Sequence, residues 1–417
     1  MNQQWLLIGL LVLSYVASML ATGRTIRGFG LPSGSEYLLL GFVLGPVALG
    51  FVGSSLLETF APLLVVGAAW IALVAGVGYG VVGGRKVQPA RAVVGVVIAL
   101  LLCTSVASSV WYLLQFLGVF GTEERRIVAI GAGAIGSETT RHAVRWVVER
   151  HGARGTLSDA LADYARAGVL APALLLSALF SANPVPGLSE LPWAARAALA
   201  VGVGVVLGLV ALLLLGRDFR RDESWGVLLG TSLLGVGIAT RLELSAISTN
   251  FFLGLTLAIF SPHSAEVKAM VGPTEKPVVL PVAVLAGASL KAFPFALELL
   301  SVFVLARVVG AFAVGSALGV FVPAARAAGR GLGFSLVSSG AFTLACAVSL
   351  QQRFPGEVGQ VLLAVGAVAL LSGELLGPLM LRRALTLSGD IPLNTPAPPD
   401  ATSEHQERAD LQQDKHP

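Results

Sequence analysis

Long apolar segments, separated by short polar ones, run through nearly the whole chain. A helix needs roughly 20 mostly apolar residues to cross the hydrocarbon layer, because its backbone N–H and C=O groups must bond within the segment. Candidate segments lie at about 4–22, 32–53, 58–82, 91–118, 126–148, 157–181, 191–216, 224–241, 245–262, 277–290, 294–322, 331–351 and 357–381. The pattern predicts an all-α, polytopic integral membrane protein with about 13 transmembrane helices.

The charges between these segments predict an orientation. If the N-terminus is outside, the inside connections hold sixteen lysines and arginines and the outside connections hold six. Cytoplasmic loops carry the excess of basic residues in membrane proteins. We therefore expect a multi-pass protein of the cell membrane, such as a bacterial inner membrane, with a cytoplasmic C-terminus.

Composition agrees with a lipid environment and excludes several other classes. The chain of 417 residues is 55% hydrophobic and 12% charged, with a mean hydropathy of +0.81. This is more apolar surface than one water-soluble core buries. The net charge of +4 is scattered between apolar segments, so membrane topology explains it better than nucleic-acid binding. Cys103 and Cys346 have neither metal-ligand nor redox spacing.

The two ends of the chain differ. Residues 1–385 form the predicted transmembrane domain, and the first apolar run lacks a basic n-region and a cleavage site, which favours a retained helix. Residues 386–417 are polar and rich in proline, without apolar periodicity. That composition predicts a disordered cytoplasmic tail.

Gly131, Gly133 and Gly136 match the dinucleotide-binding pattern G-x-G-x-x-G. The pattern needs a strand before it and a helix after it, whereas membrane-length apolar runs flank it here. We therefore interpret these glycines as small residues that permit close helix packing or local unwinding. A P-loop, HExxH and GxSxG are all absent from the sequence. We expect neither an enzyme nor a cofactor.

Several blocks, in order along the chain, resemble the monovalent cation:proton antiporter superfamily, in particular its bacterial thirteen-helix branch of sodium/proton and potassium-efflux antiporters. Residues 37–50, with Gly41, Gly45-Pro46 and Gly50, are similar to the family's second helix. Residues 139–155 resemble its fifth segment and residues 333–340 its twelfth. Shorter blocks at 276–290, 306–310 and 377–378 also match.

The resemblance implies two inverted repeats, with discontinuous helices near segments 5 and 12 that cross at the midplane, where an ion would bind. It also implies a monovalent cation and a proton as partners in the lipid bilayer, and a homodimer. The sequence does not decide between Na⁺ and K⁺.

The sequence departs from the family at three ionisable positions. An acidic pair is expected near residues 166–169, but no acid stands there, and Asp163 lies a turn earlier. Ala311 occupies the place of a lysine, and Ala341 the place of an acid. These departures bear on proton coupling rather than on the fold.

Glu138 is the first candidate for the shared carboxylate, because a lone charge inside an apolar segment costs roughly 2.5–3.5 kcal/mol unless it meets a partner or water. Asp163 is the second, although its spacing also fits an ion pair with Arg166. We interpret Arg307, deep in the segment at 294–322, as a counter-charge for an acid such as Glu138 or for helix ends at the crossing.

Hydroxyl groups complete the candidate site. Thr139 and Thr140 offer oxygen ligands to a dehydrated cation if the helix breaks there, and otherwise bond back to the helix. Ser338, Ser339 and Thr343 are candidates for the opposite side of the crossing, although small hydroxyl residues are also common packing partners.

Two functions fit these observations. The first is exchange of a monovalent cation for protons, with Glu138 or Asp163 as the shared carboxylate. The second is a protein of the same fold without proton coupling, which acts as a sensor, a partner subunit or a passive ion pathway. The three departures favour the second, and the buried charges favour the first.

Overall fold

The computed structural model describes residues 34–79, 88–139, 141–184, 191–216, 221–321 and 332–391. Over these ranges the chain consists of α-helices and one short 3-10 helix, and they contain no strand. The expected all-α fold is therefore confirmed for this part of the chain. The first predicted segment, residues 4–22, lies outside the described residues.

Each of the other twelve predicted segments contains a helix or a pair of helices. In the first half these are α2 (Ser35–Leu44), α3 (Ser54–Val77), α4 (Pro89–Leu117), α5 (Thr122–Gly136), α6 (Arg141–His151), α7 (Thr156–Gly168), α8 (Leu170–Ala182) and α9 (Trp193–Leu215). In the second half they are α10 (Arg221–Arg241), α11 (Ala246–Phe260), α13 (Glu275–Ala288), α14 (Ala296–Phe321), α16 (Leu332–Ser335), α17 (Ala341–Arg353) and α18 (Glu357–Leu387). α12 (Ser264–Val271) and η1 (Gly272–Thr274) lie before the predicted segment 277–290, which therefore begins too late: together with α13 they form one apolar stretch, Ser264–Ala288. Among the described residues, seven stretches are long and apolar enough to cross a membrane.

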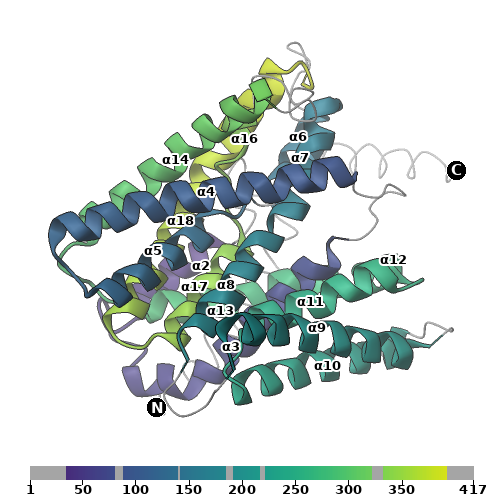
Figure 1. Ribbon diagram of the computed structural model, residues 1–417, viewed down its shortest axis with the longest axis horizontal. Coiled ribbons are helices and arrows are strands. Elements are labelled where there is room, and N and C mark those ends of the chain that lie inside the picture. Colours follow the sequence, from purple (N-terminus) through teal and green to yellow (C-terminus); the bar gives the residue numbers. More distant parts are fainter. Residues whose placement is uncertain are drawn as a thin grey trace, which may run out of the picture.

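The helices pack in two groups (Figure 1). One group, here called the crossing bundle, contains α4 to α8, α14 and α16 to α18. The other, here called the flanking layer, contains α2, α3 and α9 to α13, and it contacts the bundle mainly through α3 and α17 and through α8 and α9. A large cluster of buried apolar side chains, including Leu176, Phe251 and Phe303, spans both groups.

Glycines set the spacing within the flanking layer. A methyl group added to Gly76 of α3 would collide with the backbone of Phe251 in α11, and one added to Gly254 of α11 would collide with the backbone of Leu73 in α3. Small residues let two membrane helices approach until their backbones touch, which increases van der Waals contact between them. This contact matters because lipid tails, unlike water, do not drive apolar helices together.

The glycines of the G-x-G-x-x-G pattern serve the same purpose. Gly133 lies in α5 against the backbone and side chain of Cys103 in α4, and Gly136 lies against Val106 and Phe303. The interpretation as close packing is confirmed.

Two membrane segments are interrupted. α5 ends at Gly136 and α6 begins at Arg141, while α16 ends at Ser335 and α17 begins at Ala341. Each interrupted segment follows a long continuous helix, α4 in the first case and α14 in the second. The expected discontinuous helices are thus present, whereas the inverted-repeat relation stays a prediction.

The end of the described chain packs onto the bundle. After α18, Asp390 is buried, and its Oδ2 accepts a hydrogen bond from the Ser158 N–H (2.8 Å) in the first turn of α7. Its carbonyl accepts one from the Arg154 N–H (3.0 Å). Of the predicted tail, residues 386–391 are therefore in contact with the bundle, and residues 392–417 lie outside the described part.

Candidate ion-binding site

The two interruptions meet inside the crossing bundle. Residues 137–139 lie between α5 and α6, and residues 336–340 between α16 and α17. The Thr139 hydroxyl lies 3.5 Å from the Leu336 carbonyl, which it donates to weakly. Gly373 and Gly377 of α18 press against Ser339 and Ser338, and a side chain at either glycine would collide with them.

Glu138 lies at this crossing and is 4% exposed. Its Oε2 accepts hydrogen bonds from the N–H groups of Gly340 (3.2 Å) and Thr343 (2.7 Å) and from the Thr343 hydroxyl. These donors belong to the N-terminus of α17, so the carboxylate of one interrupted helix caps the second half of the other. Capping stabilises a carboxylate, because the first N–H groups of a helix have no partners within it and carry partial positive charge.

Arg307 of α14 joins the two interruptions from the other side. Its Nη2 donates to the carbonyls of Glu138 (2.7 Å) and Ser338 (3.0 Å), and its Nη1 donates to the Ser339 hydroxyl. The side chain is 2% exposed. Both carbonyls lie where a helix is interrupted, so the guanidinium takes the place of helical hydrogen bonds there. It also supplies a positive charge beside Glu138.

The charges at the crossing compensate one another. One carboxylate, one guanidinium and the positive ends of α6 and α17 meet there, together with the carbonyl end of α5. Because Arg307 contacts the Glu138 carbonyl rather than its carboxylate, no described residue forms an ion pair with that carboxylate. Among the described residues, no hydrogen bond goes to Glu138 Oε1, and neither the buried Ser338 hydroxyl nor Arg307 Nε has a partner. These atoms keep hydrogen-bonding capacity that no described residue uses.

Asp163 belongs to a different cluster. It lies buried in α7, where Oδ2 is 3.4 Å from Nη1 of Arg91 in α4, and Oδ1 is 4.0 Å from Nη1 of Arg166. The i,i+3 pair with Arg166 that the sequence suggested is present, and Arg91 is a second positive partner. Two arginines therefore hold this carboxylate between α4 and α7.

A further buried carboxylate, Glu374 of α18, also caps a helix. Its Oε2 accepts a hydrogen bond from the Ser35 N–H (3.2 Å) at the start of α2. This contact links the crossing bundle to the flanking layer.

The structure thus brings together most of the predicted site residues, namely Glu138, Thr139, Arg307, Ser338 and Ser339. Thr140 lies outside the described residues. Sequence reasoning missed the Gly340 N–H as a donor to Glu138, and it missed Arg91 as the partner of Asp163. The glycine before α17 was a usable signal, since the first N–H groups of a helix have no partners within it and a glycine has no side chain that could cap them.

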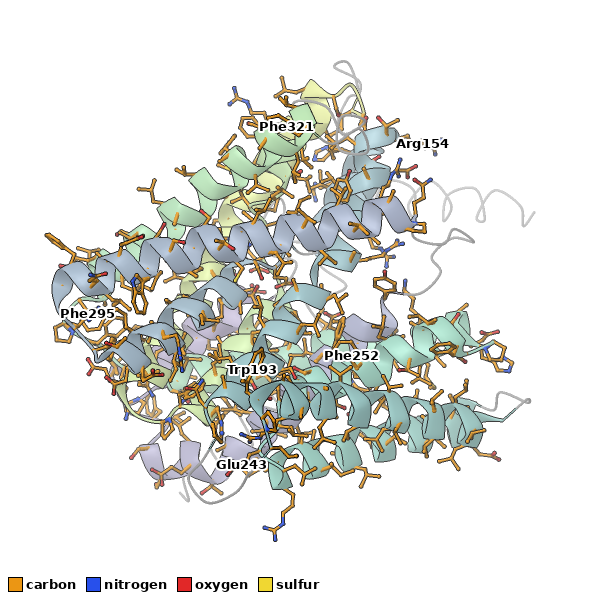
Figure 2. All side chains as sticks on the ribbon, in the orientation of Figure 1. Arg154, Trp193, Glu243, Phe252, Phe295 and Phe321 are labelled. Carbon is orange, nitrogen blue, oxygen red and sulfur yellow. The ribbon has the colours of Figure 1, made fainter. Side chains whose placement is uncertain are left out.

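A cavity of about 1060 Å³ lies between the two groups of helices, at the end where α3 ends and α7 begins. Figure 2 shows Arg154, which lines it, at the opposite end of the molecule from Phe295. The cavity reaches Val144 of α6, little more than one turn from Thr139. Its charged lining residues are Arg145, Arg154, Arg166, Lys268, Asp159 and Glu275.

No cluster of three or more His, Cys, Asp or Glu side chains suited to a bound metal occurs in the described ranges. The crossing instead offers one carboxylate with hydroxyl and carbonyl oxygens. Oxygen donors of this kind, in a site of low net charge, suit a monovalent cation or a proton.

No protein-family model matches the chain, and no curated protein matches it by sequence. Solved structures match it in fold. One is the sodium proton antiporter MjNhaP1 from Methanocaldococcus jannaschii at pH 8, with a TM-score of 0.65 and 17% identity, covering 93% of this chain and 99% of that one. An electron-microscopy structure of the same antiporter gives a TM-score of 0.59 and 16% identity, covering 94% and 99%. The chain has the fold of this antiporter, as the resemblance predicted.

Proposed function

We propose that the chain is a secondary transporter that exchanges a monovalent cation for protons, with Glu138 as the shared carboxylate. The observation that carries the proposal is the buried carboxylate at the meeting point of two interrupted helices, in a chain with the fold of a sodium proton antiporter. One carboxylate that binds either a proton or a cation couples the two fluxes, because occupation by one excludes the other.

The local geometry gives the carboxylate atoms different tasks. Oε2 is held by the N-terminus of α17, which fixes the side chain in position. Oε1 is the atom that takes the proton or faces the cation, with the Thr139 and Ser338 hydroxyls as further ligands. Arg307 holds both unwound segments in place, and its charge keeps the resting site close to neutral.

Asp163 has a structural role in this proposal. Its two arginine partners occupy its oxygens and compete with any monovalent cation for them. The acidic pair expected from the resemblance is absent, so Glu138 alone carries the exchange. The cavity is the access route from the side that the loop charges assign to the cytoplasm.

The test is proton flux in liposomes. Purified protein is reconstituted with an imposed pH gradient and a pH-sensitive dye inside, and Na⁺, Li⁺, K⁺ or Rb⁺ is added in turn. We expect one or two of these ions to collapse the gradient in the wild type, and Glu138→Gln to remove the response. Glu298→Gln, which changes an exposed carboxylate on α14, is the matched control and keeps wild-type flux.

The second candidate function is an uncoupled protein of the same fold. It is favoured by Ala311 and Ala341, which stand where the antiporter resemblance predicts ionisable groups. A wild type that responds to none of the four cations, with Glu138→Gln unchanged, would replace the exchange proposal with this one.

A further inference from the structure

A second buried arginine lies far along the chain from Arg307. Arg196, in the first turn of α9, is 3% exposed, and its Nη1 donates to the Ser181 carbonyl (3.3 Å) at the end of α8. Its Nη2 is buried and has no hydrogen-bond partner among the described residues. Within them, no acid lies within ion-pair distance of Arg196.

The Ser181 hydroxyl is unsatisfied in the same way. It is buried at 2% exposure and has no partner in the described part of the chain. Because Arg196 contacts the carbonyl of this same residue, two side chains with unpaired buried donors meet at the end of α8. A buried donor left unpaired costs about 1–3 kcal/mol, and more when it belongs to a charged group.

A second guanidinium adds positive charge to this place. Arg353, at the end of α17, donates to the Asn183 carbonyl (2.7 Å) and lies over the Phe180 ring at 5.7 Å. Its Nε is also buried without a partner in the described ranges. Glu243 contacts Arg353 at 3.4 Å, and Figure 2 shows Glu243 and Trp193 at the same end of α10 and α9.

Among the described residues, acids do not balance the charge at this end. Two arginines meet one carboxylate, and the carbonyl end of α8 offsets only about half a charge. A hydrogen-bond acceptor with one negative charge would balance this excess. It would also pair with the two buried donors, Arg196 Nη2 and the Ser181 hydroxyl.

We propose that Arg196 Nη2 and the Ser181 hydroxyl, with Arg353 as the neighbouring charge, bind a small monovalent anion such as chloride at the end of α8. The anion ties α8 of the crossing bundle to α9 of the flanking layer and neutralises Arg196. The site lies at the end that the loop charges assign to the outside, away from the cavity.

The test is the thermal stability of the purified protein in detergent, with chloride replaced by gluconate at constant ionic strength. A ligand at a hundred times its Kd stabilises the folded state enough to raise Tm by roughly 3 °C in a chain of this size. We expect a saturable rise of this kind with chloride in the wild type. We expect Arg196→Met, which removes the charge and keeps the bulk, to show none.

Two further variants keep the test decisive. Ser181→Ala deletes one donor and should raise the half-saturating chloride concentration about tenfold, which corresponds to the loss of one charge-assisted hydrogen bond. Arg241→Met removes an exposed arginine at the same end and should respond to chloride like the wild type. Bromide should give an anomalous scattering peak beside Arg196.

Equal Tm in chloride and gluconate for the wild type, or an unchanged chloride response in Ser181→Ala, would overturn the proposal. The readout does not involve transport. Failure of this inference and failure of the exchange proposal are therefore separate results.

Discussion

At the scale of single residues, Arg307 acts through backbone carbonyls. The groups it bonds belong to two different interrupted segments, at Glu138 and Ser338, so one side chain joins both. A guanidinium presents several donors in a fixed plane, whereas an ammonium is a compact point charge. The role therefore depends on shape as well as on charge.

Substitution of Arg307 separates these two contributions. Arg307→Ala leaves the Glu138 carboxylate without a counter-charge and two buried carbonyls unpaired, and should lower the free energy of unfolding by about 3–5 kcal/mol. Arg307→Lys keeps the charge and should lose about half as much. Thermal unfolding in detergent measures both, with Arg241→Ala as an exposed control. Equal losses for the alanine and lysine variants would contradict a role of the planar guanidinium.

The sequence identified these two charges and left their contacts open. Glu138 and Arg307 were predicted as site residues because each is a charge inside an apolar segment. A charge there is costly unless it has a partner or a function. Their bonds to Gly340 and Ser338 depend on backbone groups freed by the helix interruptions, and a side-chain pattern carries no information about those groups. Asp163 was a weaker candidate because its spacing to Arg166 also fitted an ion pair, and its second partner, Arg91, was missed because it is 72 residues away along the chain.

At the scale of helices, α18 supports the crossing. Gly373 touches Ser339, so any larger residue would push residues 336–340 away from Glu138. We expect Gly373→Ala to reduce stability by about 1–3 kcal/mol and to weaken the proposed exchange, because overpacking displaces the backbone. Gly230→Ala in α10, where an added methyl meets no atom within 4 Å, is the matched control. It should change stability by less than about 1 kcal/mol. Wild-type exchange in Gly373→Ala would show that the contact is not needed for transport.

The contact between α4 and α7 gives another test at this scale. Asp163→Asn leaves Arg91 and Arg166 facing a neutral amide and should cost about 1.5–3 kcal/mol of stability. Under the proposed function this variant keeps cation-dependent proton flux when assayed below its unfolding temperature. If the folded variant instead lost that flux in the same vesicles, Asp163 would be a group that couples proton to cation transport.

At the scale of the whole molecule, twelve predicted apolar segments coincide with helices. The prediction of these segments succeeded because a helix in lipid must bond all its backbone groups internally. That requirement fixes both the length and the apolar composition of each segment. The positions of the interruptions were predicted through the resemblance, since residues 137–139 and 336–340 contain polar side chains but no proline, the residue that most often breaks a helix. Packing in two groups depends on which faces meet, and helices that are apolar on most sides do not reveal those faces.

Orientation can be measured with single cysteines, because both native cysteines are buried and should react slowly. We expect Arg241→Cys to react with a membrane-impermeant maleimide from outside the cell, and Ala265→Cys, on the cavity, to react only in inverted vesicles. The reverse pattern would invert the assignment made from loop charges. Labelling of both from one side would exclude the topology altogether.

A single shared carboxylate also predicts stoichiometry. If Glu138 alone couples the fluxes, one proton is exchanged for one monovalent cation, and no net charge moves. The exchange rate in liposomes should then be unaffected by a membrane potential set with a potassium gradient and valinomycin, measured with Na⁺ or Li⁺ as the cation. Acceleration by a potential would require a second titrating group.

The attachment of Asp390 to the first turn of α7 ties the end of the described residues to the crossing bundle. Gly155, whose added methyl would collide with Asp390, and Ser158 both line the cavity. A force on the residues that follow position 391 would therefore reach the cavity rim through the two hydrogen bonds of Asp390, to Ser158 (2.8 Å) and Arg154 (3.0 Å). A purification tag or fluorescent protein joined directly after Leu387 would remove this anchor, whereas one joined after residue 391 would keep it.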